Sequence, residues 1–407
     1  MTTEIGQQQP GEPSPSTAAL TGMRVLDLTQ VMSGPFCTMI LADMGADVIK
    51  IESPTAGDQT RKSWGTAVKG EDSRAFFSLN RNKRSVVLDL KSTEGREQFY
   101  ELVETADVVV ENFRPGVAKR LGVDADTLRA RRPSLIYASI SGFGQTGPYA
   151  NYPGYDLIAQ AMTGVMSITG EPGGAPVKSG IPVADLGAGM FCAIGILTAY
   201  VERLRSGEGQ YLETSLFEAA LAMSVWESTE FWATGEAPVA LGSANRMSAP
   251  YQAMETADGY VTIGANNEKL WRLLCEVLGV PELLEDPRFV DNNRRMAHRP
   301  ELVAALTPVF RTRGTDEWVR VLLEAGVPAG PIRNYQQVLD DDPHVRARGM
   351  IQHFDHPIEG VIPVLASPIK LQRTPPSVRT PPPLLGEHTA QVLGELARPR
   401  VEVDSAV

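Results

Sequence analysis

The chain has 407 residues, of which 43% are hydrophobic and 21% charged, and its 49 acidic and 38 basic residues give a formal net charge of −11. This composition is typical of a globular protein of two or three domains. The negative charge argues against non-specific nucleic-acid binding, which needs a basic surface. The longest apolar run, 186–201, is shorter than the about 20 residues of a membrane helix, so we predict a buried core helix and no membrane association.

The chain ends and the cysteines predict where the protein resides. Residues 1–20 are rich in Pro, Gln, Ser and Thr and lack a basic segment followed by an apolar one, so we predict a disordered tail and no signal peptide. Residues 396–407 are predicted to form a second tail. The three cysteines, Cys37, Cys192 and Cys275, are widely spaced, which favours reduced thiols and a cytoplasmic location. We expect no metal site.

The first half of the chain alternates strand-like and helix-like segments. Residues 23–29 and 46–52 are predicted strands joined by a loop at 30–36 and a helix over 37–45, which is a βαβ unit. No GxGxxG motif follows the first strand, so the dinucleotide fingerprint is missing. The same theme repeats in a helix at 92–106, capped by Ser92 or Thr93, and in strands at 85–90, 106–112 and 134–144. Residues 21–224 therefore predict a Rossmann-like α/β domain with a mostly parallel sheet.

From about residue 225 the pattern becomes that of a smaller α+β domain, which we assign to 225–330. Residues 251–267 indicate two strands around a turn at Asp258-Gly259. Amphipathic helices are predicted at 268–279 and 315–326, each ending at glycine. The Pro- and Gly-containing segment 326–332 is interpreted as a crossing between domains.

Asp185 is the one charged residue in the stretch SGIPVADLGAGMFCAIGILTAY (179–200) that lies among small and apolar residues. An aspartate before an apolar helix is typical of an N-cap. The same position also suits a nucleophile, because a carboxylate can attack an activated acyl group and form a mixed anhydride. The glycines of Leu-Gly-Ala-Gly would let a ligand approach the backbone, and free N–H groups there could bind an oxyanion. The stretch alone leaves both interpretations open.

Two basic segments are candidate phosphate sites. ENFRPG (111–116) follows a strand end, where ligands bind in open α/β sheets, and Arg114 and Arg120 lie near it. NRNKRS (80–85) gathers Arg81, Lys83 and Arg84. Solvated surface arginines are the alternative in both cases. The glycine-rich SGFGQTGPY (141–149) also follows a strand.

These stretches together resemble the class III CoA-transferases, the CaiB/BaiF family, over about residues 22–393. The resemblance is carried by VLDLTQVMSGPFCTMILADMGADVIKIE, NRNKRSVVLDLK, ADVVVENFRPG, GFGQTGPY, VADLGAGM, GVPAGPI and PPPLLGEHT, in this order. It implies a Rossmann-like large domain built from both ends of the chain, with residues 331–395 returning to it. It also implies a homodimer of interlocked subunits.

The resemblance places the family's nucleophilic aspartate on Asp185. In such enzymes this carboxylate attacks an acyl-CoA thioester, and an anhydride and an aspartyl-CoA thioester follow before CoA passes to an acceptor acid. Acyl-CoA and a small carboxylic acid are then the partners and substrates, with no tightly bound cofactor. The implied CoA contacts are Gln30, Val31, Met32, Ser33, Leu88, Asn112, Phe113 and Arg120. Some members carry arginine at Ser53 and lysine at Ser141, and we expect Lys50, Arg84 or Arg114 to compensate.

Two departures from family patterns refine the expected activity. Members that use oxalate carry a run of glycines, which 244–259 lacks, so oxalate is disfavoured. APYQ (249–252) followed by TADGY (256–260) instead resembles members that use succinyl-CoA and other dicarboxylates. Arg246 could pair with the distal carboxylate of such a substrate, or be a surface arginine. The racemase branch uses a histidine where this chain has Tyr155, a poor base at neutral pH, and no histidine precedes His298. We therefore expect CoA transfer, with succinyl-CoA as the candidate donor. An acyl-CoA racemase or isomerase and a non-catalytic CoA-binding protein are the alternatives.

Overall fold

The computed structural model describes residues 18–63 and 69–396. Most of the predicted tail 1–20, and all of the predicted tail 396–407 except its first residue, lie outside the described residues. The chain divides into two compact units. Unit 1 comprises the chain up to Val165, Ser179–Trp226 and the chain from His344, and unit 2 comprises Met166–Lys178 and Glu227–Pro343.

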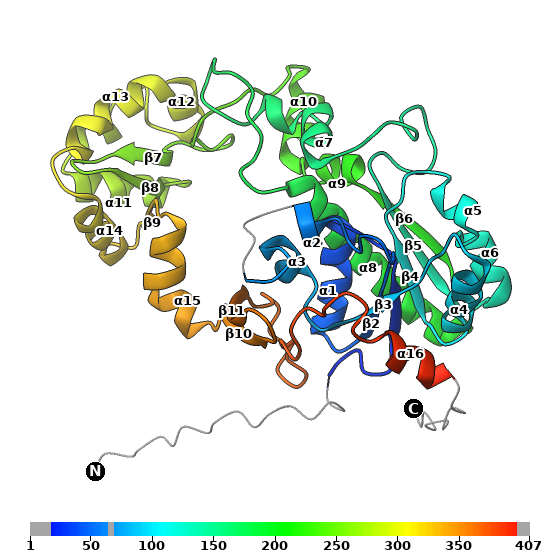
Figure 1. The fold of residues 1–407 in the computed structure, drawn as a ribbon. Helices are drawn as coiled ribbons and strands as arrows, with labels where there is room; N and C mark the ends of the chain where they lie inside the picture. The colour runs from blue at the N-terminus through cyan, green and yellow to red at the C-terminus, as the bar shows by residue number, and fades with distance from the viewer. Residues whose placement is uncertain (1–17, 64–68, 397–407) are drawn as a thin grey trace, which may run out of the picture. The chain divides into compact units, whose positions relative to one another are not determined.

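Unit 1 is built on a six-stranded parallel sheet with the order β3-β2-β1-β4-β5-β6 (Figure 1). Its strands are β1 (Arg24–Asp27), β2 (Asp47–Glu52), β3 (Lys83–Val87), β4 (Val108–Glu111), β5 (Ile136–Ser141) and β6 (Tyr211–Ser215). All adjacent strands pair in parallel, so their carboxyl ends meet at one edge. The strand order reverses between β1 and β4, and in open α/β sheets this is the position where ligands bind. The mixed α/β class with a parallel sheet is confirmed.

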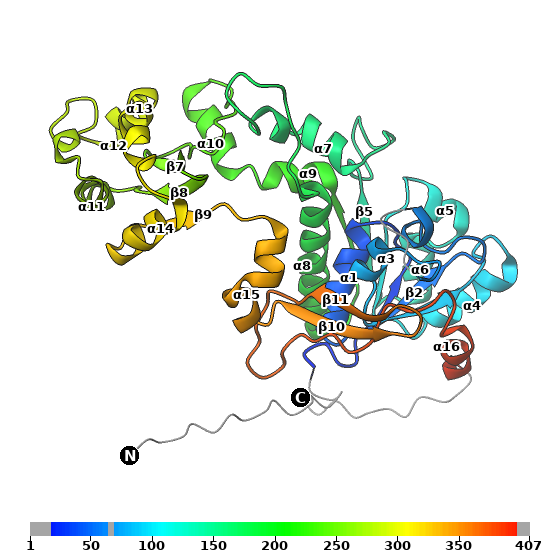
Figure 2. The same ribbon diagram turned by 60° about the vertical axis from the view of Figure 1, so that its left-hand side comes forward.

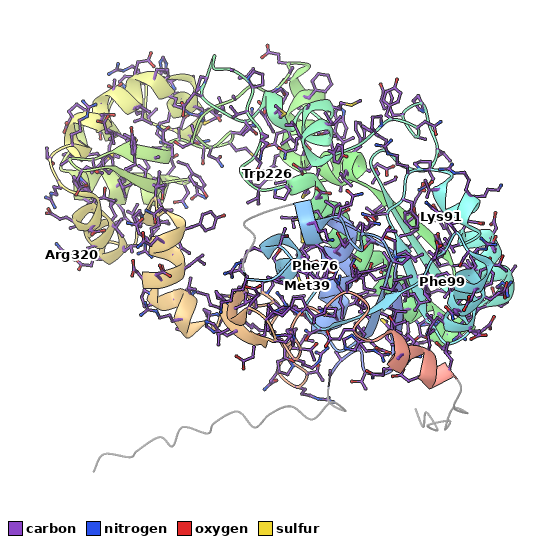
Figure 3. The ribbon with its side chains drawn as sticks, in the orientation of Figure 1. Met39, Phe76, Lys91, Phe99, Trp226 and Arg320 are labelled. Carbon is purple, nitrogen blue, oxygen red and sulfur yellow. The ribbon has the colours of Figure 1, made fainter. Side chains whose placement is uncertain are left out.

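Helices cover both faces of this sheet with separate apolar cores. One face carries α1 (Ser33–Asp43), α7 (Asp156–Met162), α8 (Val183–Ser206) and α9 (Leu216–Ala222). The other carries α4 (Thr93–Val103), α5 (Val117–Leu121), α6 (Ala125–Arg131) and α16 (Thr389–Leu396). Met39, on α1, and Phe99, on α4, mark the two sides of the sheet (Figure 3). The predicted cap of the 92–106 helix is present, since the Ser92 hydroxyl accepts a hydrogen bond from the Gly95 N–H.

The predicted apolar helix is α8, which stands beside α1 (Figure 2). Within the described part of the chain it is the one helix long and apolar enough to cross a membrane by length and composition. Ala188, Cys192 and Ile196 nevertheless bury one of its faces in the core of unit 1. The opposite face leaves Ile194 and Leu204 exposed. The helix therefore has one face in the core and one apolar face that no described residue covers.

The C-terminal part of the chain completes unit 1. The hairpin of β10 (Ile351–His356) and β11 (Gly360–Leu365) packs on α3 (Arg74–Leu79) through Phe76 and Phe77. Short helices α2 (Thr60–Ser63) and α15 (Pro343–Ala347) flank these elements. The chain then passes to α16, where Val392 is buried against α4 and the sheet.

Unit 2 is an antiparallel three-stranded sheet with helices around Trp271 and Trp318. The predicted hairpin is formed by β7 (Tyr251–Glu255) and β8 (Tyr260–Gly264), and β9 (Ala329–Pro331) pairs with β8. Its helices are α10 (Val225–Thr234, which begins in unit 1), α11 (Glu268–Leu278), α12 (Asn292–Ala297), α13 (Arg299–Phe310) and α14 (Thr315–Glu324), with short turns at Val165–Ser167, Pro281–Leu284 and Gln337–Asp341. The interpretation of 326–332 as a crossing is wrong, because the whole segment lies within unit 2 and its residues 329–331 form the edge strand β9, where proline is tolerated. The chain leaves unit 2 at Pro343.

Candidate active site

Asp185 lies in the first turn of α8 but does not cap it. The N-cap residue is Pro182, and the helix has no cap from its own flanking side chains. Asp156, the first residue of α7, supplies the cap instead: its Oδ1 accepts hydrogen bonds from the N–H groups of Ala184 (2.9 Å) and Asp185 (3.3 Å). The N-cap interpretation of Asp185 is therefore wrong, because a carboxylate from another helix already fills that position.

The surroundings of Asp185 favour the neutral form of its carboxyl group. Burial raises its pKa from 3.8 to about 7, and the nearby negative charge of Asp156 raises it as well. A hydrogen bond with the Ser33 side chain acts in the opposite direction. Asp185 forms no ion pair with any described residue. Its carboxylate is thus half-buried, unneutralised and free to react when ionised.

The glycines after Asp185 serve helix packing. A Cβ added at Gly189 would lie 2.6 Å from the Ser33 carbonyl oxygen and 3.0 Å from a ring carbon of Phe36. A Cβ at Gly187 would lie 2.7 Å from the Met223 methyl group. Both glycines are buried, so the expectation that they clear space for a ligand is wrong. Gly189 instead lets the amino end of α1 approach α8 closely, which places Ser33 against Asp185.

The residues predicted to contact CoA gather at the carboxyl edge of the sheet. Gln30 and Asn112, which follow β1 and β4, hold each other by two hydrogen bonds: the Gln30 N–H donates to Asn112 Oδ1 (2.9 Å), and Asn112 Nδ2 donates to the Gln30 carbonyl (2.8 Å). Predicted contacts that follow the ends of β1, β3 and β4 are Val31, Met32, Ser33, Leu88 and Phe113. The two loops on either side of the strand-order reversal are therefore tied together.

The predicted basic residues fall into two groups. Arg114 and Arg120 follow the carboxyl end of β4, are exposed, and make no ion pair with a described residue, so they are available to a phosphate. Arg84 lies near the amino end of β3, at the opposite edge, and is paired with Asp47 (2.7 Å) and Glu395 (2.7 Å). Lys50 is completely buried and paired with Asp58 (2.9 Å). The prediction that Arg84 or Lys50 binds CoA phosphates is wrong, because both charges are already neutralised inside the fold.

Arg81 and Lys83, the other members of the basic cluster, are also internal. Arg81 pairs with Asp43 at 2.7 Å, and Lys83 pairs with Asp27 at 3.0 Å. All four side chains are buried. This cluster therefore binds neighbouring helices and strands together and presents no basic surface.

The two predicted substrate residues, Tyr155 and Arg246, lie in different units. Tyr155, in unit 1, directly precedes Asp156 and is 62% exposed. Arg246, in unit 2, is mostly buried, with Glu230 at 3.3 Å, Glu227 at 3.8 Å and a hydrogen bond to the Val239 carbonyl. The charge of Arg246 is therefore already met by two glutamates, and this structure gives it no free role toward a carboxylate.

Asp156 is the residue beside Asp185 that sequence reasoning missed. It lies in GYDLIAQ (154–160), directly after Tyr155, which we compared with the racemase histidine. Its Oδ2 accepts a hydrogen bond from Gln160 (2.6 Å). The available signal was an aspartate directly before the mostly apolar segment LIAQAM, which is typical of the start of a helix. The residues that it caps are distant in the chain, so local pattern could not connect it with Asp185.

Comparison with known proteins identifies the family. The sequence model of CoA-transferase family III matches residues 20–389. The chain belongs to CoA-transferase family III. Its resemblance to the class III enzymes is thus confirmed, and it is an enzyme of the CoA-transferase class. A crystal structure of a CaiB/BaiF family protein from Brucella suis superposes with a TM-score of 0.82 at 39% identity, covering 93% of this chain and 100% of that one.

Two similar enzymes are named for different acids. Succinate–glutarate CoA-transferase from Agrobacterium fabrum is 42% identical over 93% of this chain and 95% of its own length. Acetyl-CoA:oxalate CoA-transferase from Acetobacter aceti is 40% identical over 96% of this chain and 99% of its own length. The second relative weakens the argument against oxalate, because a protein this similar over its full length is named for that acid.

Proposed function

We propose that the protein transfers CoA from succinyl-CoA to a dicarboxylic acid such as glutarate, with Asp185 as the nucleophile. The observation that carries this proposal is the state of Asp185: a half-buried carboxylate without a cation, next to the amino end of α1. The name of the Agrobacterium relative supports the choice of donor and acceptor.

The proposed reaction passes through two anhydrides. An Asp185 oxygen attacks the thioester carbonyl of the donor, the C–S bond breaks, and CoA leaves as a thiolate. The thiolate attacks the Asp185 carbonyl carbon and releases the donor acid, which leaves an aspartyl-CoA thioester. The acceptor carboxylate then displaces the thiolate to form a second anhydride, and the thiolate attacks the acceptor carbonyl. This last step releases the new acyl-CoA and regenerates Asp185.

The amino end of α1 is the proposed source of oxyanion stabilisation. The first N–H groups of an α-helix have no partner within the helix, and no side chain caps α1. The Ser33 side chain bonds to Asp185, so these N–H groups lie beside the reacting carboxyl group. Donors fixed in place before the reaction stabilise negative charge that develops in the transition state.

We also propose that the active form is a homodimer of interlocked subunits. An apolar groove of about 790 Å³ lies within unit 1 between α1, α8 and the strand β11. Met190 and Ile194 of α8 and Leu365 of β11 line it and are exposed in the single chain. Apolar surface of this extent supports burial against a second copy.

Racemisation is not favoured by this geometry. A racemase needs two groups that act as bases around the α-carbon, and Tyr155 occupies the position of one of them. A test is α-proton exchange in deuterium oxide without an acceptor acid, for which we expect no incorporation.

An acceptor screen tests the proposed transfer. Succinyl-CoA would be offered with a panel of mono- and dicarboxylic acids, including glutarate and oxalate, and new acyl-CoA species detected by mass spectrometry. We expect glutaryl-CoA to form with the wild type and to be lost with Asp185→Ala. Products that persist in Asp185→Ala would exclude the covalent route, whereas a species with CoA attached to Asp185 would support it.

A further inference from the structure

The loop between β1 and α1 contains a strained residue. Val31 has a φ of +70°, which lies in the left-handed region that β-branched side chains avoid. Among the described non-glycine residues, only Val31 and Asn82 have a positive φ. Such a conformation persists only where the surrounding structure over-determines it, and it tends to occur at functional sites.

A buried ion pair holds the backbone around Val31. The Val31 N–H donates to Asp58 Oδ1 at 3.2 Å. Lys50 Nζ lies 2.9 Å from Asp58 Oδ2 and donates to the Thr29 carbonyl at 2.7 Å. The pair therefore forms hydrogen bonds to the loop backbone at Thr29 and at Val31. Asn112 forms hydrogen bonds to the backbone of Gln30, which lies between them.

The pair is costly to bury, which makes a purely stabilising role a weak explanation. Both side chains are completely shielded from solvent, and a buried salt bridge often contributes little net stability against apolar replacements. Burial alone would raise the pKa of Asp58, but Lys50 lowers it below its ordinary value. Burial would lower the pKa of Lys50, but Asp27 and Asp58 raise it. Both groups therefore stay charged at neutral pH.

We propose that Lys50 and Asp58 are positioning residues that force the 29–33 loop into its strained conformation, so that it receives the acyl-CoA and sets Ser33 against Asp185. This rests on the proposed function and on the CoA contacts that the family resemblance implies for residues 30–33. Neither Lys50 nor Asp58 touches the substrate. They act by arranging the loop before binding, which removes an ordering cost from each binding event.

The test compares variants with and without the strain at Val31. CoA binding to the full-length chain would be measured by isothermal titration calorimetry for Asp58→Ala and Asp58→Asn, each with and without Val31→Gly. Glycine adopts a positive φ without penalty, so the loop no longer needs to be forced. We expect Asp58→Ala to weaken CoA binding about tenfold in the wild-type background and less than about threefold in the Val31→Gly background. Asp58→Asn keeps an acceptor for the Val31 N–H but loses the charge that pairs with Lys50, so it should show the same coupling at smaller size and keeps the test available if Asp58→Ala does not fold.

A matched control separates positioning from stability. Asp43 forms a buried ion pair with Arg81 away from the loop, so Asp43→Asn should lower the melting temperature but leave CoA affinity within about twofold. In steady-state assays, Asp58→Asn should raise the KM for the acyl-CoA donor and not that for the acceptor acid. Equal losses from the Asp58 variants in both Val31 backgrounds would overturn the proposal. A wild type that binds no CoA would instead overturn the proposed function, and this proposal with it.

Discussion

At the scale of single residues, the ionisation of Asp185 should govern the pH dependence of the reaction. Attack requires the carboxylate, and its pKa is raised to about 7 by burial and by the charge of Asp156. We expect kcat/KM to rise with pH to a midpoint near 7, because this ratio reports the free enzyme. Asp156→Asn removes the neighbouring charge but keeps an oxygen to cap α8, and should move the midpoint to lower pH. Ser33→Ala should move it to higher pH. A midpoint unmoved by either variant would show that another group controls the profile.

The same carboxyl group should make folding stability depend on pH. Its pKa is about 7 in the folded protein and near 3.8 when exposed, so the folded state holds more protons between these values. The free energy of unfolding therefore falls as pH rises from about 4 to about 7. Asp185→Asn cannot ionise and avoids this loss. We expect a higher melting temperature than wild type at pH 8 and no difference at pH 4, measured by differential scanning calorimetry. A gain of equal size at both pH values would contradict this assignment.

At the scale of elements, the crossing of α1 and α8 depends on Gly189. An added methyl group would overlap the Ser33 carbonyl and the Phe36 ring, which should separate the helices and cost about 1–3 kcal/mol. We expect Gly189→Ala to lower both the melting temperature and kcat/KM. Gly195→Ala is the matched control in the same helix, since its methyl group would meet only the end of the Leu212 side chain, at 3.2 Å. That variant should be neutral or slightly stabilised, because alanine favours helix. Similar losses from both would contradict a role for the crossing.

Short stretches of sequence predicted the features that depend on residues close together in the chain. The Ser92 cap, the Asp258-Gly259 turn and the glycine after α11 each depend on neighbours in the chain, and each is present. Strand β6 was not predicted, because YLETS alternates polar and apolar residues weakly at a sheet edge. The pairing of Arg84 with Asp47 and Glu395, and the capping of α8 by Asp156, join segments far apart in sequence. Such contacts follow from strand order, which no short window of sequence contains.

At the scale of the whole molecule, the apolar groove of unit 1 should control assembly. A charge at its centre would be costly to bury against a partner, so we expect Ile194→Glu to convert the proposed dimer to a monomer. Light scattering coupled to size-exclusion chromatography measures this. Leu323→Glu changes another exposed apolar residue, on α14 and outside the groove, and should leave the mass unchanged. A wild type that is monomeric at micromolar concentration would exclude the dimer.

The return of the chain to unit 1 has a consequence for its synthesis. Val392 of α16 fills the core behind the sheet, and Glu395 pairs with Arg24 of the first strand. A ribosome releases β1 well before α16, because all of unit 2 lies between them in the chain. Throughout that interval one apolar face of the nascent sheet lacks its final helix, and exposed apolar surface in incomplete chains promotes aggregation. Unit 1 therefore closes only after α16 has been synthesised, so a transcript truncated before α16 encodes a sheet that has lost part of its cover.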